Sequence, residues 1–219
     1  MVGVVTCDII KSRRYSKTER QEVDKLIRQA FGETIELMPE AKADKLSFSI
    51  VQGDEFQFVI NDPALAYRFA VFYRLILSLK PLKPIFRAGI GIGEIAVGND
   101  NSYKMDGSAF HRSREVFQKF EKPKFRHRIT GILSGNPELN EQFEIVAMYN
   151  DFLEQRWTDK HRMAIIYYQN TGSLEEAAKK ESISYQAMQQ RISRSGFQQF
   201  AKGLNFYTNE LNARLKSCI

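Results

Sequence analysis

The sequence has little cysteine and histidine, and it has no long apolar run. Its two cysteines, Cys7 and Cys218, lie near opposite ends of the 219-residue chain and match no zinc spacing. The three histidines show no zinc pattern either. Such cysteine usage is typical of a reduced protein, and we expect a cytoplasmic location. The apolar run at the N-terminus is too short for a signal peptide or a membrane span, so we expect no membrane association.

The chain also lacks internal repeats and low-complexity linkers, and its length allows one or two domains. Its net charge of +6 is unevenly distributed. Residues 1–155 carry 22 basic and 21 acidic side chains, whereas residues 156–219 carry ten basic and five acidic ones. A basic excess confined to the last quarter of the chain suits a nucleic-acid partner. A basic surface with no partner is the common alternative.

Residues 1–135 alternate between strand and helix patterns. Apolar runs predict strands over 2–10, 45–51, 56–61, 85–97 and 125–132. Apolar faces with helical spacing predict three helices. The first is expected to start at a capping box formed by Thr18 and Gln21, and the other two are expected over 65–79 and 108–120. Three glycines in the fourth strand indicate close approach of a ligand or of another backbone, such as a packed helix. The order βαββαβ predicts an α+β, ferredoxin-like fold.

Asp8 and Asp54 are the candidate metal ligands. Asp8 ends the first apolar run, and Asp54 lies between the two strands of a predicted hairpin. An acidic residue that closes a buried strand is costly unless something pairs with it. If the first strand lies beside the hairpin, the carboxylates become neighbours that suit one or two Mg²⁺ or Mn²⁺ ions and the phosphates of a nucleoside triphosphate. For Asp8 alone, the simpler alternative is an acid that caps a nearby amide.

Residues 136–219 are predicted to form an all-α unit. A connecting helix is expected over 139–155 and another over 158–171, which Gly172 can end. Ser173 can cap the next helix, and Ser184 can cap a further one after a short turn at 182–184. Helix, short turn and helix is the helix-turn-helix pattern, here similar in length to the sigma-factor type.

The last predicted helix has an apolar side and a polar side. Its polar side is expected to enter the major groove of duplex DNA, with Gln186 and Gln189 as base readers, because glutamine pairs bidentately with adenine. Lys179, Lys180 and Arg191 are better placed for phosphates. The DNA-facing residues are Tyr185, Gln186, Gln189, Gln190 and Arg194. A three-helix unit that binds a protein is the alternative.

Four segments, taken in order, resemble the catalytic domain of class III nucleotidyl cyclases. Residues 5–12 are similar to the first metal-binding strand, and residues 51–56 to the hairpin with the second metal-binding aspartate. Residues 86–98 resemble the strand with an arginine-glycine-isoleucine run that ends in glycine-glutamate. Residues 106–114 resemble the start of the transition-state helix. With its helix-turn-helix, the whole chain resembles the bacterial SatD family. The resemblance implies a palm-type, nucleotidyl cyclase-like domain over residues 1–135.

The departures from the cyclase pattern affect base recognition and the transition state. Ile50 replaces the base-reading lysine, His111 replaces an asparagine, and Glu115 replaces an arginine. Arg114 lies one residue early, which turns its side chain by about 100° around the helix, and Arg112 lies nearby. The resemblance therefore implies nucleotide and metal binding more than orthodox cyclization. Its catalytic candidates are His111, Arg112 and Arg114.

The nucleotide-binding candidates are Gly53, Glu55 and Arg87. The segment 52–56 also resembles the signature of diguanylate cyclases, in which the glycine at position 53 lets the nucleotide approach the backbone. For Glu55 the alternative is a solvated hairpin residue. For Arg87 the alternative is an ion pair that fixes a strand edge.

Three functions remain open from the sequence. The first is a nucleotide-responsive transcriptional regulator that binds DNA. The second is an active nucleotidyl cyclase or related phosphodiester-forming enzyme. The third is a catalytically dead scaffold whose helical unit binds a protein. A homodimer is compatible with each of them, because class III enzymes build their sites across a dimer and helix-turn-helix proteins commonly dimerise.

Overall fold

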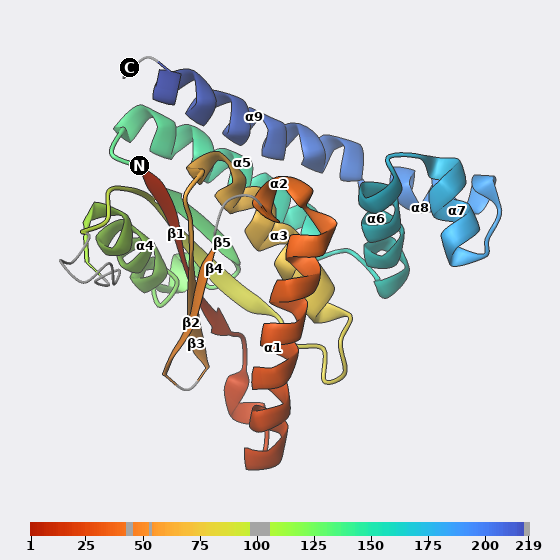
Figure 1. The fold of residues 1–219 in the computed structure, drawn as a ribbon, viewed down its shortest axis with the longest axis horizontal. Helices are drawn as coiled ribbons and strands as arrows, with labels where there is room; N and C mark the ends of the chain where they lie inside the picture. Colours follow the sequence, from red (N-terminus) through yellow and green to blue (C-terminus); the bar gives the residue numbers. More distant parts are fainter. Residues whose placement is uncertain (43–45, 53, 97–105, 217–219) are drawn as a thin grey trace.

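The computed structural model describes residues 1–42, 46–52, 54–96 and 106–216. Its centre is a mixed sheet of five strands in the order β2-β3-β1-β4-β5 (Figure 1). Strand β1 (Val2–Ile9) pairs antiparallel with β3 (Glu55–Ile60) and with β4 (Phe86–Gly93). Strand β2 (Ser47–Gln52) pairs antiparallel with β3, and β5 (Thr130–Leu133) pairs parallel with β4. The central position of β1 beside the hairpin confirms the arrangement predicted from the sequence.

Helices cover both faces of this sheet. Helices α1 (Lys17–Leu37) and α3 (Ala66–Ser78) lie on one face, and α4 (Ser108–Lys119) lies on the other (Figure 1). Short helical segments join them: η1 (Ser12–Arg14), α2 (Pro39–Lys42), η2 (Pro63–Leu65) and η3 (Pro123–Phe125). Side chains alternate along β1, so that Cys7 and Ile9 lie in the core beneath α1 and α3, whereas Thr6 faces α4 and lies 3.0 Å from the Ser113 hydroxyl.

The glycines of β4 make room for α4. A side chain at Gly91 would place its Cβ 2.1 Å from the carbonyl oxygen of Ala109 and 2.3 Å from the amide nitrogen of Ser113. A Cβ at Gly89 would likewise lie 2.6 Å from the carbonyl oxygen of Ser113. The helix backbone thus rests directly on the strand. Of the two explanations that the sequence left open, helix packing is the one that the structure supports.

Two element boundaries differ from the prediction. Helix α1 begins two residues earlier than expected, because the capping box is formed by Ser16 and Glu19 instead of Thr18 and Gln21. The predicted strand over 125–132 is largely wrong. The 3₁₀ helix η3 occupies its start, and β5 begins only at Thr130, where pairing with β4 begins. The peptide N–H groups of residues 129 and 130 donate hydrogen bonds to the carboxylate of Asp151, in the helix that follows β5.

Five helices follow β5 in the described part of the chain. They are α5 (Pro137–Glu154), α6 (Asp159–Thr171), α7 (Leu174–Glu181), α8 (Tyr185–Ser195) and α9 (Phe197–Lys216). The predicted caps are confirmed, since Gly172 has a φ of 69° after α6 and the Ser184 hydroxyl accepts a hydrogen bond from the N–H of Ala187. Helix α9 was not predicted. It runs back along α5 to the five-stranded sheet with its covering helices, which we call the sheet unit (Figure 1). There the Tyr207 hydroxyl donates to the carbonyl of Pro63 at 2.7 Å.

A buried ionic network fixes α5 to the sheet unit. The Arg74 guanidinium of α3 donates to both carboxylate oxygens of Glu154, at 2.6 and 2.8 Å, and both side chains are almost fully buried. Burial opposes the charge on Arg74, but the attraction of Glu154 outweighs it and raises the pKa of the guanidinium. One turn earlier, Asp151 accepts hydrogen bonds from Arg128 and from two peptide N–H groups. None of the helices in the described part of the chain is both long and apolar enough for a membrane span.

Candidate functional site

Asp8 lies near the end of β1, and Asp54 lies in the turn that immediately precedes β3, the strand next to β1. In the antiparallel register Asp8 stands opposite Glu55 of β3 on one side and opposite Arg87 of β4 on the other. The N–H of Ile9 donates to the carbonyl of Asp54 at 3.2 Å, so the hairpin turn lies directly against the end of β1. The fold therefore brings together backbone positions that are 46 residues apart in the sequence.

The Asp8 carboxylate is held by Arg87. The guanidinium donates from Nε to Oδ1 at 3.0 Å and from Nη2 to Oδ2 at 2.6 Å, a bidentate pair on the α4 side of the sheet. The ring centroids of Phe117 and Phe120 lie 5.9 and 5.5 Å from the same guanidinium. The hydrogen bonds that Arg87 donates to Asp8 raise the pKa of the Arg87 guanidinium. Arg87 thus occupies the ion pair that the sequence left open as its alternative, and Glu55 lies half-buried beside this pair.

Asp54 opens on the opposite side of the sheet. It is exposed and lines a cavity of about 560 Å³ between the end of β1 and the start of α1. The cavity has an apolar floor that includes Ile9, and Ser12 stands at its wall. Its charged lining residues are Arg13, Lys17, Arg20, Asp24 and Asp54. Partial burial raises the pKa of Asp24. Three cations and two carboxylates around one opening are suited to a polyanion that carries a divalent ion.

This geometry limits how a metal ion could be held. An ion shared by Asp8 and Asp54 would have to compete with the Arg87 guanidinium for the Asp8 carboxylate, and the two carboxylates open on different faces of the sheet. In the parts of the chain that the structure describes, no three or more His, Cys, Asp or Glu residues are grouped so that they could hold a metal. Asp54 with ligand phosphates is the arrangement that the residues fit, since Mg²⁺ commonly uses one or two carboxylates, phosphate oxygens and water.

The three catalytic candidates on α4 do not line this cavity. The Arg112 guanidinium folds back onto β4 and donates to the carbonyl of Ile92 at 2.6 Å. His111 is exposed and lies 3.1 Å from the Asp106 carboxylate. Arg114 is exposed on the outer side of the helix. Gly53, the predicted point of backbone approach, lies outside the described residues.

The polar side of α8 is exposed, as the sequence predicts. Met188 and Ile192 are buried against α6, α7 and α9. No hydrogen bond or ion pair joins the opposite side chains to other described residues. These side chains are those of Tyr185, Gln186, Gln189, Gln190 and Arg194. A side of a helix with exposed amides and a guanidinium, and without an internal partner, is available to an external one.

The predicted phosphate contacts have partners on the surface of the protein. Lys179 lies 3.1 Å from Glu175 and 3.0 Å from Glu176. Lys180 donates to the side-chain oxygen of Asn170, and Arg191 pairs with Glu181. Exposed ion pairs such as those of Lys179 are worth little, so a phosphate can replace them at small cost.

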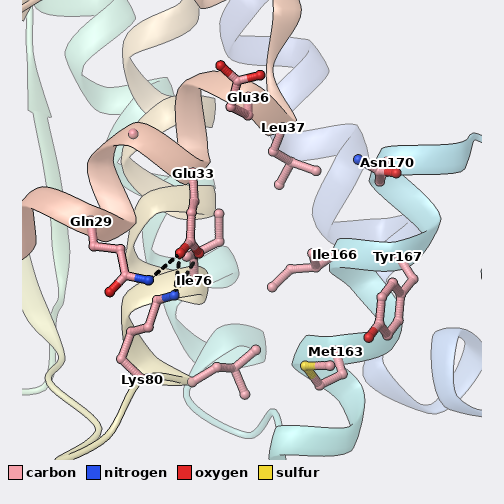
Figure 2. A pocket seen from close by; sticks show the side chains of 12 residues that line it. Gln29, Glu33, Glu36, Leu37, Ile76, Lys80, Met163, Ile166, Tyr167 and Asn170 are labelled. Carbon is pink, nitrogen blue, oxygen red and sulfur yellow. Dashed lines mark hydrogen bonds and ion pairs between the residues drawn. The ribbon is translucent and has the colours of Figure 1, made fainter. Parts of the chain in front are cut away.

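A second cavity, of about 680 Å³, was not predicted. It lies between α1, α3 and α6, where the sheet unit meets the C-terminal helices (Figure 2). Figure 2 shows Lys80 directed at Glu33, whose carboxylate oxygens lie 2.5 and 2.7 Å from its ammonium nitrogen, and Gln29 donating to the same carboxylate at 2.9 Å. The side facing them is formed by Met163, Ile166 and Tyr167 of α6. The sequence could not reveal this cavity, because its walls are distant segments brought together by tertiary packing.

Comparison with known proteins gives a family match and one weak structural similarity. The family model of SatD matches residues 2–211. Among solved structures, a bacterial light-regulated adenylyl cyclase is 12% identical in sequence, with a TM-score of 0.40, over 60% of this chain and 74% of that chain. No curated protein matches the sequence significantly.

Proposed function

The chain belongs to the SatD family, and from this premise we propose that it is a nucleotide-responsive DNA-binding protein. We base the nucleotide part on the sheet unit, whose strand order β2-β3-β1-β4-β5 is compatible with the ferredoxin-like, nucleotidyl cyclase-like domain expected from the sequence. In this proposal the sheet unit binds a nucleoside triphosphate with Mg²⁺ or Mn²⁺. Its helices α7 and α8 act as a helix-turn-helix that binds duplex DNA. The observation that carries this proposal is the exposed polar side of α8, which has no partner among the described residues.

The cavity beside Asp54 supports the nucleotide part. Arg13 and Lys17 are exposed at its rim and make no ion pair with other described residues, so their charges are available to a triphosphate. Asp54 would supply a carboxylate oxygen to the divalent ion that the phosphates carry. The ion neutralises phosphate charge when it is bound. The chain's own residues bind and orient the triphosphate at the end of β1.

The Asp8–Arg87 pair favours binding over turnover. A two-ion mechanism needs both aspartates as ligands, and here the Asp8 carboxylate already pairs with the Arg87 guanidinium, which a metal ion would have to compete with. Ile50, in place of the base-reading lysine, and Arg114, one residue early on its helix, also favour binding over turnover. We therefore expect weak or absent adenylyl and guanylyl cyclization in assays with Mg²⁺ or Mn²⁺. A turnover rate within the ordinary enzyme range of about 1–1000 per second would establish the second candidate, an active cyclase.

Two measurements on the full-length chain test the proposal. In a thermal-shift assay, nucleoside triphosphates with Mn²⁺ should raise the melting temperature of the wild type. Asp54→Asn should abolish this shift, whereas Asp106→Asn, which changes an aspartate that does not line the cavity, should retain it. An unchanged shift in Asp54→Asn would remove the assigned role of this carboxylate.

DNA binding is measured by fluorescence anisotropy on duplexes of mixed sequence at two salt concentrations. Arg194→Ala should weaken binding, and Arg126→Ala, an exposed arginine far from α8 in the sequence, should not. Affinity should fall steeply with salt, as expected when phosphates are neutralised. If the wild type shows no salt-dependent binding, the helical unit is a protein-binding module, which is the scaffold function.

A further inference from the structure

Helix α5 carries most of the large apolar side chains that are exposed in the described part of the chain. Ile145 is 64% exposed, and Met148, Tyr149 and Phe152 are each about half exposed, at 48, 50 and 50%. These four residues recur at helical spacing, so they form one stripe along the helix. The other side of α5 is buried against β5 and α9. We call this exposed set the α5 stripe.

The α5 stripe ends in opposite charges. Glu141 is exposed one turn before Ile145, and it has no hydrogen bond or ion pair with other described residues. Arg156 is exposed one turn after Phe152. Its guanidinium carbon lies 3.4 Å from the centroid of the Phe152 ring, and Nη1 donates to the carbonyl of Phe152 at 2.9 Å. Along the chain the stripe thus runs from an acid, through four apolar residues, to a base.

The α5 stripe is complementary to a second copy of itself that runs in the opposite direction. Met148 and Tyr149 are adjacent at its midpoint, Ile145 and Phe152 are equally far from that midpoint, and so are Glu141 and Arg156. In a two-fold symmetric interface, residue i contacts residue j of the second copy, and residue j contacts residue i in return. Antiparallel pairing of two α5 helices about this midpoint would place apolar residues on apolar ones and each Glu141 near Arg156 of the second copy.

We propose that the protein is a homodimer in which two α5 helices pack antiparallel about a two-fold axis between Met148 and Tyr149. A second copy is the occupant that the charges select, because one patch supplies both the acid and the base at matching distances. The partner surface is therefore already present on the chain. The proposal stands on this surface alone and does not depend on nucleotide or DNA binding.

The size of the stripe sets the strength of the dimer. Half-exposed aromatic and large aliphatic side chains contribute on the order of 100 Å² each, so the stripe offers roughly 400 Å² of apolar surface per copy. A stable interface buries about 800 Å² per partner, and the polar rim of Glu141, Gln155 and Arg156 would have to supply the remainder. We expect a dissociation constant in the micromolar range, with monomer and dimer in exchange.

A dimer of this kind would also position the two α8 helices. Tyr149 and Arg156 of the α5 stripe line a groove together with Ser193 and Arg194 at the end of α8. The α5 contact therefore fixes the C-terminal ends of both α8 helices near the two-fold axis. If the proposed DNA binding holds, this arrangement favours a DNA site with two-fold symmetry.

Sedimentation equilibrium of the full-length chain, from about 1 to 200 μM, tests the dimer. The wild type should move from the 25.3 kDa mass of one chain towards twice that mass. Tyr149→Glu should remain monomeric over the whole range, because it places two carboxylates at the axis. Tyr185→Glu is the matched control, since Tyr185 is an exposed tyrosine of similar exposure, 46%, on α8. It should dimerise like the wild type.

Charge reversal tests the antiparallel pairing itself. Glu141→Arg alone and Arg156→Glu alone each place like charges together twice, and each should weaken the homodimer by about tenfold. A mixture of these two variants should form a heterodimer of wild-type strength, because its charges are again complementary. A wild type that is monomeric at all concentrations, or a mixture no stronger than the single variants, would overturn the proposal. So would a Tyr149→Glu variant that dimerises normally.

Discussion

Replacement of Asp151 by alanine should be among the most destabilising single changes in this protein. Its side chain is 2% exposed. One carboxylate oxygen, Oδ2, accepts hydrogen bonds from Nε of Arg128 at 3.2 Å, from the N–H of Ile129 at 2.9 Å and from the N–H of Thr130 at 3.0 Å. These contacts join α5 to the start of β5, so the change removes one of the buried polar links between the connecting helix and the sheet.

The magnitude follows from the groups left without partners. Asp151→Ala leaves two peptide N–H groups and one buried guanidinium N–H without their acceptor. Loss of one partner from a buried ion pair costs about 3–5 kcal/mol. For a chain of this length each kcal/mol lowers the melting temperature by about 2–4 °C, so the expected decrease is on the order of 10 °C.

Urea denaturation followed by circular dichroism measures this loss as a shift of the unfolding midpoint. Asp151→Asn is the matched variant, because its amide oxygen can still accept hydrogen bonds from the N–H groups of residues 129 and 130. It should lose clearly less stability than Asp151→Ala. A loss below about 1 kcal/mol for the alanine variant, which is the average for ordinary substitutions, would refute the assigned role of this network. Equal losses in both variants would show that the N–H acceptor contributes nothing.

Two further predictions concern pH and packing. Burial raises the pKa of Asp151 from the usual 3.8 to about 6; a raised folded-state pKa stabilises most below pH 3.8, and this contribution is lost as the pH rises through 6. Between pH 4 and 7 the wild type should therefore lose up to about 3 kcal/mol of unfolding free energy relative to Asp151→Asn. A difference in unfolding free energy between the two proteins that is the same at every pH would contradict this. Gly91→Ala should destabilise by about 1–3 kcal/mol, because its Cβ would meet the α4 backbone at 2.1 Å. Gly32→Ala, with nothing within 4 Å, is its control, and equal unfolding midpoints would show that α4 can shift freely.

The sequence predicted the elements whose signal is local. A nearly continuous apolar run specified β1, and glycine and serine specified the end of α6 and the starts of α7 and α8. The start of α1 was misplaced because two overlapping pairs, Ser16 with Glu19 and Thr18 with Gln21, have the same spacing. Local spacing cannot choose between such pairs.

The features that were missed depend on contacts between distant residues. Gly203 disfavours a helix on propensity alone, yet α9 continues through it. The glycine allows α9 to pack closely on α5, since a Cβ there would lie 2.8 Å from the side-chain nitrogen of Asn150. The pairing of Asp8 with Arg87 joins residues 79 positions apart and follows only from strand register. The α5 stripe was hidden because the buried side of α5, with Leu139 and Phe143, is apolar as well.

The central claim is that nucleotide binding and DNA binding are coupled in one chain. Its most direct test is the anisotropy of a labelled duplex titrated with the full-length protein, without nucleotide and with ATP or GTP plus Mn²⁺. We predict salt-sensitive DNA binding whose dissociation constant changes by at least about fivefold with one of the two nucleotides. Asp54→Asn should bind DNA but show no such change. A wild-type dissociation constant that is the same in all three conditions would contradict the claim.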